Sequence, residues 1–250
     1  MATDPLHQFQ IQPVVELPRV AGLDLSLTNS AVYMILAALL ATGLLIVGMR
    51  NRSLVPTRLQ SIAELLYEFV ANLVRENAGA EARKYFPFVF SIFIFILFGN
   101  LLGMIPGTFT FTSHIIVTFA LAATVFLFVT ILALVKHGLH FFSFFMPAGT
   151  PIALAVIIVP IEVISYLSRP VSLSIRLFAN MMAGHTMLKV FAGFTVSMGA
   201  ALGAAGYAFG LVPVILNVAL IGFEILVAFM QAYVFTVLTC IYIRDALELH

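Results

Sequence analysis

Stretches of about twenty uncharged, apolar residues recur along the chain, and they constrain its fold more than any other feature. A helix rises 1.5 Å per residue, so a stretch of this length matches the roughly 30 Å hydrocarbon core of a bilayer. The first is Asn29 to Met49. Phe86 to Ile105 and Ile115 to Val135 follow as a pair, joined by a threonine-rich turn that contains Pro106 and Gly107. We therefore predict one transmembrane helix followed by a transmembrane hairpin.

The composition agrees with an all-α, polytopic membrane protein. The chain is 62% hydrophobic and 9% charged, whereas a soluble domain is roughly 45 to 50% apolar and 25% charged. Its net charge of +1 offers no concentrated basic surface for nucleic acid. One cysteine, Cys240, excludes an internal disulfide and a thiolate metal cage. No nucleotide or metal motif occurs, so we predict no cofactor and no metal ligands.

The basic residues gather on one side of the predicted helices. Six of the twelve Lys and Arg residues lie between Arg50 and Lys84. An apolar face recurs there at helical spacing and predicts an interfacial amphipathic helix: Leu59, Ile62, Ala63, Leu66, Phe69, Val70 and Leu73. The positive-inside rule places this segment and the loop after Lys136 in the cytoplasm or matrix. With the N-terminal tail outside and Arg244 inside, the chain must cross the membrane an odd number of times. The first helix and the hairpin account for three crossings, so the remaining residues cross twice.

Two apolar stretches make these last crossings, and both are longer than a bilayer requires. Pro151 to Phe191 would measure about 60 Å as one helix, so it must be tilted, or kinked at Pro160 or Pro170. Val212 to Ile243 is also long. The glycines between them favour close helix approach: Gly199, Gly203, Gly206 and Gly210.

The predicted fold therefore has about five membrane-crossing helices and one interfacial helix, and the last two crossings are long and steeply tilted. Its parts are a tail outside (1–28), a transmembrane helix (29–49), an interfacial helix inside (50–85), a transmembrane hairpin (86–135), an inner loop (136–150), a tilted helix hairpin (151–243) and a C-terminal tail inside (244–250).

Polar residues form a stripe on each long helix. On the first long helix they are Glu162, Arg169 and Arg176, which are spaced by seven residues. Asn180 lies one turn beyond Arg176 on the same face. Those of the second are again spaced by seven: Asn217, Glu224 and Gln231.

Partners in an antiparallel hairpin have residue numbers with a nearly constant sum, so Arg176 should lie at the depth of Gln231, and His185 at that of Glu224. Glu162 is then nearest the inside. Nine residues separate Arg176 from His185, which places them on opposite faces of a helix. We expect His185 to face the second long helix and Arg176 to face another subunit.

Two interpretations stay open for each of these groups. A guanidinium at the bilayer centre costs roughly 2.5 to 3.5 kcal/mol on insertion scales, so Arg176 needs a function or a structural ion pair with Glu162 or Glu224. The pair of His185 and Glu224 suits a proton relay or a buried hydrogen bond. Lys189 and Arg169 are expected to reach toward the membrane interfaces.

Three segments carry a family resemblance. They are residues 165–185 (SYLSRPVSLSIRLFANMMAGH), residues 98–106 (FGNLLGMIP), and Glu224 with residues 230–235 (MQAYVF). The chain resembles subunit a of F-type ATP synthases across residues 29–243, and is most similar to alphaproteobacterial and mitochondrial members.

The resemblance implies a stator that carries protons to and from a rotating ring of proteolipid subunits, and so couples proton flow to ATP synthesis. Arg176 matches the arginine that attracts the ring carboxylates and separates two offset half-channels. His185 and Glu224 match the outer relay, in an order that is reversed in some bacterial relatives. Asn180 and Gln231 match polar positions near the arginine, and Glu162 matches the inner acid.

The resemblance also implies partners and a location. The partners are the proteolipid ring, the membrane subunit of the peripheral stalk, the rest of the ATP synthase complex and membrane lipid. The location is the bacterial inner membrane, or the mitochondrial inner membrane if the chain is organellar, and the chain alone is not an enzyme. The main alternative is a self-contained secondary ion transporter, which would show an inverted repeat. Another is an intramembrane enzyme with a Ser-His, paired-Asp or metal-ligand set. We find neither pattern.

Overall fold

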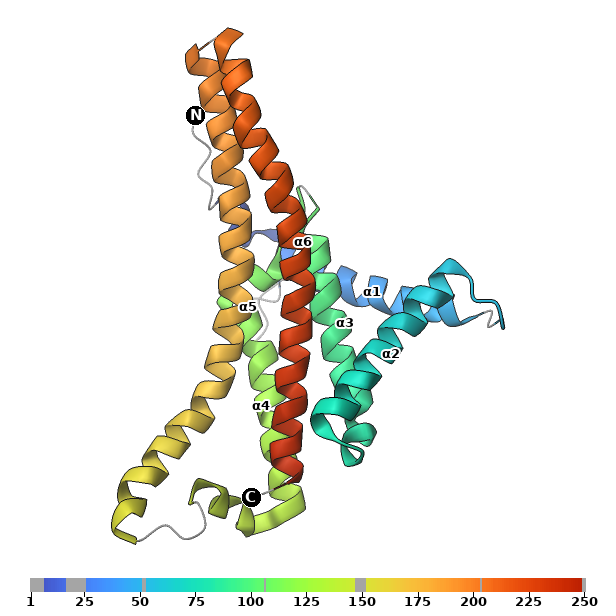
Figure 1. The fold of residues 1–250 in the computed structure, drawn as a ribbon, viewed down its shortest axis with the longest axis vertical. Helices are drawn as coiled ribbons and strands as arrows, with labels where there is room; N and C mark the ends of the chain where they lie inside the picture. Colours follow the sequence, from blue (N-terminus) through green and yellow to red (C-terminus); the bar gives the residue numbers. More distant parts are fainter. Residues whose placement is uncertain are drawn as a thin grey trace. The chain divides into compact units, whose positions relative to one another are not determined.

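The structure is a computed structural model that describes residues 7–16, 26–50, 53–105, 107–146, 152–202 and 204–248. These residues form mostly α-helix (Figure 1). The helices are α1 (Asn29–Arg50), α2 (Arg58–Ala78), α3 (Phe86–Gly103), α4 (Ile115–His137), α5 (Ile152–Leu202) and α6 (Ala204–Leu247), with 3-10 turns η1 (His7–Phe9), η2 (Glu81–Tyr85), η3 (Phe111–Ser113) and η4 (Gly138–Phe145). Five helical segments are long and apolar enough to cross a membrane, which confirms the prediction of an all-α polytopic membrane protein: Asn29–Arg50, Glu81–Gly103, Ile115–Phe142, Leu154–Ala200 and Gly210–Leu247.

The chain divides into two compact units. The first contains Met1–Thr42, Phe95–His114 and Leu177–Ala232. The second contains Gly43–Ile94, Ile115–Arg176 and Tyr233–His250. Helices α1, α3, α5 and α6 each contribute residues to both units.

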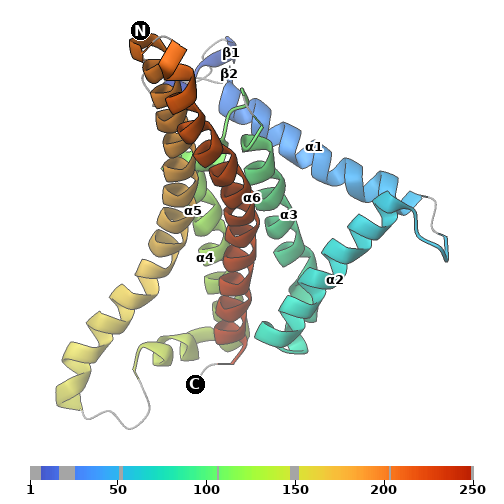
Figure 2. The same cartoon turned by 45° about the horizontal axis from the view of Figure 1, so that its top comes forward.

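In the first unit, the end of α5 and the beginning of α6 run side by side as an antiparallel pair (Figures 1 and 2). The two helices are 51 and 44 residues long, so they extend through the glycine-rich segment that we expected between them. Gly203, which separates them, lies outside the described residues. Apolar residues are tolerated on nearly every face of these helices because lipid does not penalise their exposure.

The turn after α3 packs against the end of that helix. Thr108 Oγ1 donates a hydrogen bond to the carbonyl oxygen of Leu102 (2.6 Å) or Ile105 (2.7 Å), and each of these oxygens also accepts a backbone N–H of the turn. Gly107 has a φ of 89°, a conformation that glycine adopts without strain. Pro106 lies outside the described residues. The predicted threonine-rich turn is thus confirmed over residues 107–114.

The N-terminal segment is more ordered than the plain tail that we predicted over residues 1–28. Strands β1 (Pro13–Val15) and β2 (Leu27–Thr28) pair antiparallel beside the start of α1 (Figure 2). The backbone N–H of Asn29 donates to the carbonyl oxygen of Gln12 (3.0 Å), so the ribbon is joined to the first helix. Residues 1–6 and 17–25 lie outside the described residues.

In the second unit, α2 is the predicted amphipathic helix. Thr57 caps its first turn, since its hydroxyl accepts from the backbone N–H of Gln60 (3.4 Å), and Gly79 ends it with a φ of 79°. Leu59 and Ile62 of the predicted apolar face are exposed, because the buried stripe is rotated away from them. The stripe consists of Gln60, Ala63, Val70, Leu73, Val74 and Ala78.

Side chains of α4 bind the end of α6 in the same unit. Lys136 Nζ donates to Glu81 Oε2 (2.9 Å) and to the carbonyl oxygen of Leu247 (3.0 Å). The predicted C-terminal tail therefore begins later than residue 244, since α6 remains helical to Leu247. Cys240 is fully buried, as expected for a packing residue. Residues 147–151, where we predicted the start of the next apolar region, lie outside the described residues.

We predict that Gly99→Ala destabilises the first unit. A Cβ at this position would lie 2.3 Å from Phe111 Cζ, and the Phe111 ring is fully buried and cannot turn into open space. Overpacking of this kind costs about 1 to 3 kcal/mol. Thermal unfolding in detergent measures the loss. Gly193→Ala is the matched control, because nothing lies within 4 Å of its added Cβ. Equal stability of the two variants would contradict the packing described here.

Candidate functional site

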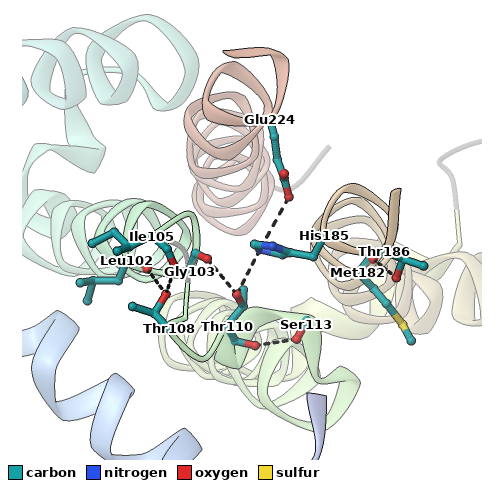
Figure 3. A network of polar contacts seen from close by, with 10 residues as sticks. All are labelled: Leu102, Gly103, Ile105, Thr108, Thr110, Ser113, Met182, His185, Thr186 and Glu224. Carbon is teal, nitrogen blue, oxygen red and sulfur yellow. Dashed lines mark hydrogen bonds and ion pairs between the residues drawn. The ribbon is translucent and has the colours of Figure 1, made fainter. Parts of the chain in front are cut away.

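His185 of α5 and Glu224 of α6 meet inside the first unit (Figure 3). The distance from His185 Nε2 to Glu224 Oε1 is 3.6 Å, and their side chains are only 11% and 4% exposed. This is the contact that antiparallel pairing predicts. At 3.6 Å the pair is close enough to attract but too far apart for a hydrogen bond, so a small side-chain movement is needed to transfer a proton.

Thr110 holds the imidazole from another direction. Its hydroxyl Oγ1 lies 3.0 Å from His185 Nε2 and 3.3 Å from the carbonyl oxygen of Gly103 (Figure 3). Phe9 of η1 also contacts the imidazole, with its ring centroid 6.5 Å away in an edge-on arrangement. Sequence reasoning missed both residues. The threonine-rich composition of the turn was the available signal for Thr110, and no signal pointed to Phe9.

Two glycines make room for this cluster. A Cβ on Gly184 would lie 2.5 Å from Glu224 Oε1, and a Cβ on Gly103 would lie 2.6 Å from Thr110 Oγ1. Both carboxyl oxygens of Glu224 are buried and have no hydrogen-bond partner among the described residues. Among the described residues, the imidazole of His185, at 3.6 Å, is the ion-pair partner of this carboxyl.

A cavity opens at each member of the pair. Glu224 lines a cavity of about 290 Å³ together with Asn180 and Gln231. His185 lines another of about 270 Å³ together with Thr110, Asn217, Lys189 and Gln8, among others. Asn217 Oδ1 is buried there without a hydrogen-bond partner in the described part of the chain. The contact between His185 and Glu224 thus connects the lining of two cavities, each of which contains polar side chains among mainly apolar ones.

The first unit therefore brings together most of the residues singled out from the sequence. They are Asn180, His185, Asn217, Glu224 and Gln231. Their placement in one unit is the geometric finding that any role for them as a group depends on.

Arg176 and Glu162 belong to the second unit. Arg176 is exposed, Glu162 is half-buried, and no ion pair joins them. The alternative of a structural ion pair with Glu162 is therefore wrong. No carboxylate among the described residues of the second unit forms an ion pair with the Arg176 guanidinium. The charge of Arg176 is therefore not balanced by an ion pair within this part of the unit.

Arg169 corrects a further expectation. It does not simply reach toward the membrane interface, because Nη1 forms an ion pair with Asp245 Oδ2 at 2.9 Å and its side chain is 22% exposed. The guanidinium also lies 5.0 Å from the centroid of Tyr242 and 5.3 Å from that of Tyr166. Such a desolvated guanidinium is stabilised by both its carboxylate and the ring faces. Arg169 thus joins α5 to the end of α6 within the second unit.

Comparison with known proteins gives one consistent result. Residues 31–244 match the family described as ATP synthase A chain. The chain is 54% identical to the ATP synthase subunit a of Agrobacterium fabrum, over 99% of both chains. It is 55% identical to the subunit a of Allorhizobium ampelinum, over 99% of this chain and 98% of the relative, and 55% identical to that of Mesorhizobium japonicum, over 98% and 96%.

We predict that Gly184→Ala impairs proton transport without preventing folding. The added Cβ would displace the Glu224 carboxyl, which is the end of a flexible side chain and can move. We expect a loss on the order of tenfold, because the carboxyl leaves its contact with His185. Proton uptake by membrane vesicles that contain the chain measures it. In Gly222→Ala, the control, nothing lies within 4 Å of the added Cβ. An unchanged rate in Gly184→Ala would contradict a role for the observed Glu224 position.

Proposed function

The chain belongs to the ATP synthase A chain family, and from this premise we propose a specific path by which it carries protons. It is a multi-pass membrane protein and a component of the membrane sector of ATP synthase, in complex with other subunits. The observation that carries the proposal is the buried contact of His185 with Glu224 at 3.6 Å.

In the proposed path, a proton enters from the outside through the cavity that Asn217 and His185 line. It passes from the imidazole to the carboxyl of Glu224, which is the next group that can accept it. Glu224 then releases it toward the cavity that Asn180 and Gln231 line. A carboxylate of a ring subunit receives the proton there, becomes neutral and can turn into lipid.

Arg176 has a different proposed role, which depends on its fixed charge. It has no carboxylate partner among the described residues of its own unit, so its guanidinium is available to a carboxylate of the ring. This attraction favours the ionised state of the arriving ring carboxylate and excludes protons from a direct route between the half-channels. Glu162 is the proposed acceptor where protons leave on the inner side. Each proton that crosses 100 mV releases about 2.3 kcal/mol.

The remaining elements of the proposal follow from this role. The partners are the proteolipid ring and the membrane subunit of the peripheral stalk, and the location is the bacterial inner membrane or its mitochondrial equivalent. The chain itself performs no ATP chemistry, because its polar residues suit proton exchange and ion pairing rather than nucleotide binding. A self-contained transporter is not favoured, since the relatives are subunits of a complex.

We predict that Arg176→Ala abolishes ATP-driven acidification of inverted membrane vesicles, because no fixed charge remains to attract the ring carboxylate. Passive proton conductance of vesicles stripped of the ATPase sector should persist or rise, because the electrostatic barrier between the half-channels is lost. Assembly of the complex is verified in the same preparation. Normal acidification with an intact complex would overturn the role proposed for Arg176.

We predict that Glu224→Gln slows ATP-driven acidification on the order of tenfold or more, because an amide of similar size cannot exchange a proton. The double exchange His185→Glu/Glu224→His should recover much of the rate, because it keeps one carboxyl and one imidazole in contact. Glu248→Gln, at an exposed position, is the control. If Glu224→Gln pumps normally, the proposed relay is wrong.

A further inference from the structure

A further cavity lies where α2 ends, in the second unit, and none of the residues of the proposed proton path lines it. It measures about 650 Å³ and is lined by the end of α2, the Gly79 turn, η2 and the first residues of α3. Three of its lining residues are cations, Arg75, Arg83 and Lys84, and none is acidic. The cavity therefore has the charge of an anion site.

These cations have no carboxylate partners within the described residues of this unit. The salt bridges of the unit join other pairs, and the adjacent acid, Glu81, is bound to Lys136 at 2.9 Å. Lys84 Nζ lies 5.1 Å from the ring centroid of Tyr85, which is a weak contact for an exposed ammonium. Glu81 also attracts Lys84 electrostatically, but its carboxylate is paired with Lys136. Three positive groups thus line one cavity in which no carboxylate contacts them, and a bound anion would be attracted there.

Helix polarity alone does not account for the arrangement. A basic residue in the last turn of a helix interacts favourably with the helix dipole, and this explains Arg75 of α2. Arg83 and Lys84 follow the Gly79 turn, whose φ of 79° reverses the chain and brings them to the same cavity. The turn therefore gathers cations from two elements around one space.

An apolar cavity of about 480 Å³ adjoins the cationic one and shares three lining residues with it, Tyr67, Phe86 and Pro87. The rings of Tyr67 and Phe86 are in contact, with centroids 4.7 Å apart. The other lining residues of this apolar cavity are mainly apolar or aromatic. It also has two acidic lining residues: Glu64 accepts a hydrogen bond from Gln60 Nε2 (2.8 Å), and Glu68 is exposed. The two cavities together suit a molecule with an anionic head and an apolar chain.

We propose that the cavity around Arg75, Arg83 and Lys84 binds the phosphate headgroup of an anionic phospholipid, whose acyl chain lies along the wall formed by Tyr67 and Phe86. The position fits, because the cavity lies between an amphipathic interfacial helix and the beginning of a membrane span. A free phosphate ion would use the three cations but not the apolar cavity beside them. An acidic protein segment would likewise leave the apolar cavity unexplained.

The test uses the whole ATP synthase complex in vesicles of phosphatidylcholine that contain a trace of phosphatidylglycerol with a photoreactive acyl chain. After illumination, the labelled peptides of residues 67–90 are quantified by mass spectrometry. The test variant is Arg75→Gln/Arg83→Gln. The control is Arg50→Gln/Arg58→Gln, which removes the same charge from exposed positions that line neither cavity.

We expect labelling of residues 67–90 to fall about tenfold or more in the test variant and to stay nearly unchanged in the control, because each basic residue near an anionic headgroup contributes substantially to binding. Unlabelled phosphatidylglycerol should compete, whereas inorganic phosphate and phosphatidylcholine should not. Equal losses in both variants would show nonspecific surface attraction, competition by inorganic phosphate would show a simple anion site, and no labelling of residues 67–90 in the unmodified complex would show that something other than lipid lies there. Each of these three results would overturn the proposal.

Discussion

The absence of a side chain at Gly184 is the constraint on which the buried polar cluster depends. Because this position of α5 is bare, the carboxyl of Glu224 can lie against the helix and contact His185, the next residue. Gly103 plays the same part on another side of the imidazole, since it admits the hydroxyl of Thr110. In a bilayer, close approach of this kind is stabilised by packing and by polar contacts rather than by exclusion of water. Two glycines therefore determine which polar groups can reach one histidine.

A membrane interior also requires that backbone polar groups find partners within the protein, and the turn after α3 meets this requirement with its own side chains. The hydroxyl of Thr108 adds to the backbone hydrogen bonds at the carbonyl oxygens of Leu102 and Ile105. Asn100, fully buried in the same helix, donates to the carbonyl oxygen of Ala228 in α6 at 3.1 Å. The turn and the two helices are thereby held in one arrangement. The hydroxyl of Thr110, in the same turn, lies 3.0 Å from His185 Nε2.

Helical periodicity explains what could be predicted from the sequence. Uncharged length predicted the membrane spans, and the register of an antiparallel hairpin predicted the contact of His185 with Glu224. Thr110 and Phe9 were missed, because they lie in a turn and in a short N-terminal element, where no period relates a residue to a neighbour. The partner of Arg169 was missed for another reason: the last helix was expected to end at Ile243, which left Asp245 in a tail. Contacts made by loops and helix ends depend on local geometry that a repeat of 3.6 residues does not encode.

The threonine explains how a buried histidine can change its protonation without losing its hydrogen bond. One nitrogen, Nε2, faces both Thr110 Oγ1 and Glu224 Oε1. When Nε2 carries no proton, the hydroxyl of Thr110 can rotate and donate to it. When Nε2 is protonated, the same oxygen can accept from it, because a hydroxyl is both a donor and an acceptor. A residue that only donates or only accepts would leave one of the two states with an unsatisfied buried group, at a cost of about 1 to 3 kcal/mol. The hydroxyl thus lowers the difference in free energy between the two protonation states, and this is the property that the proton relay proposed for His185 and Glu224 requires.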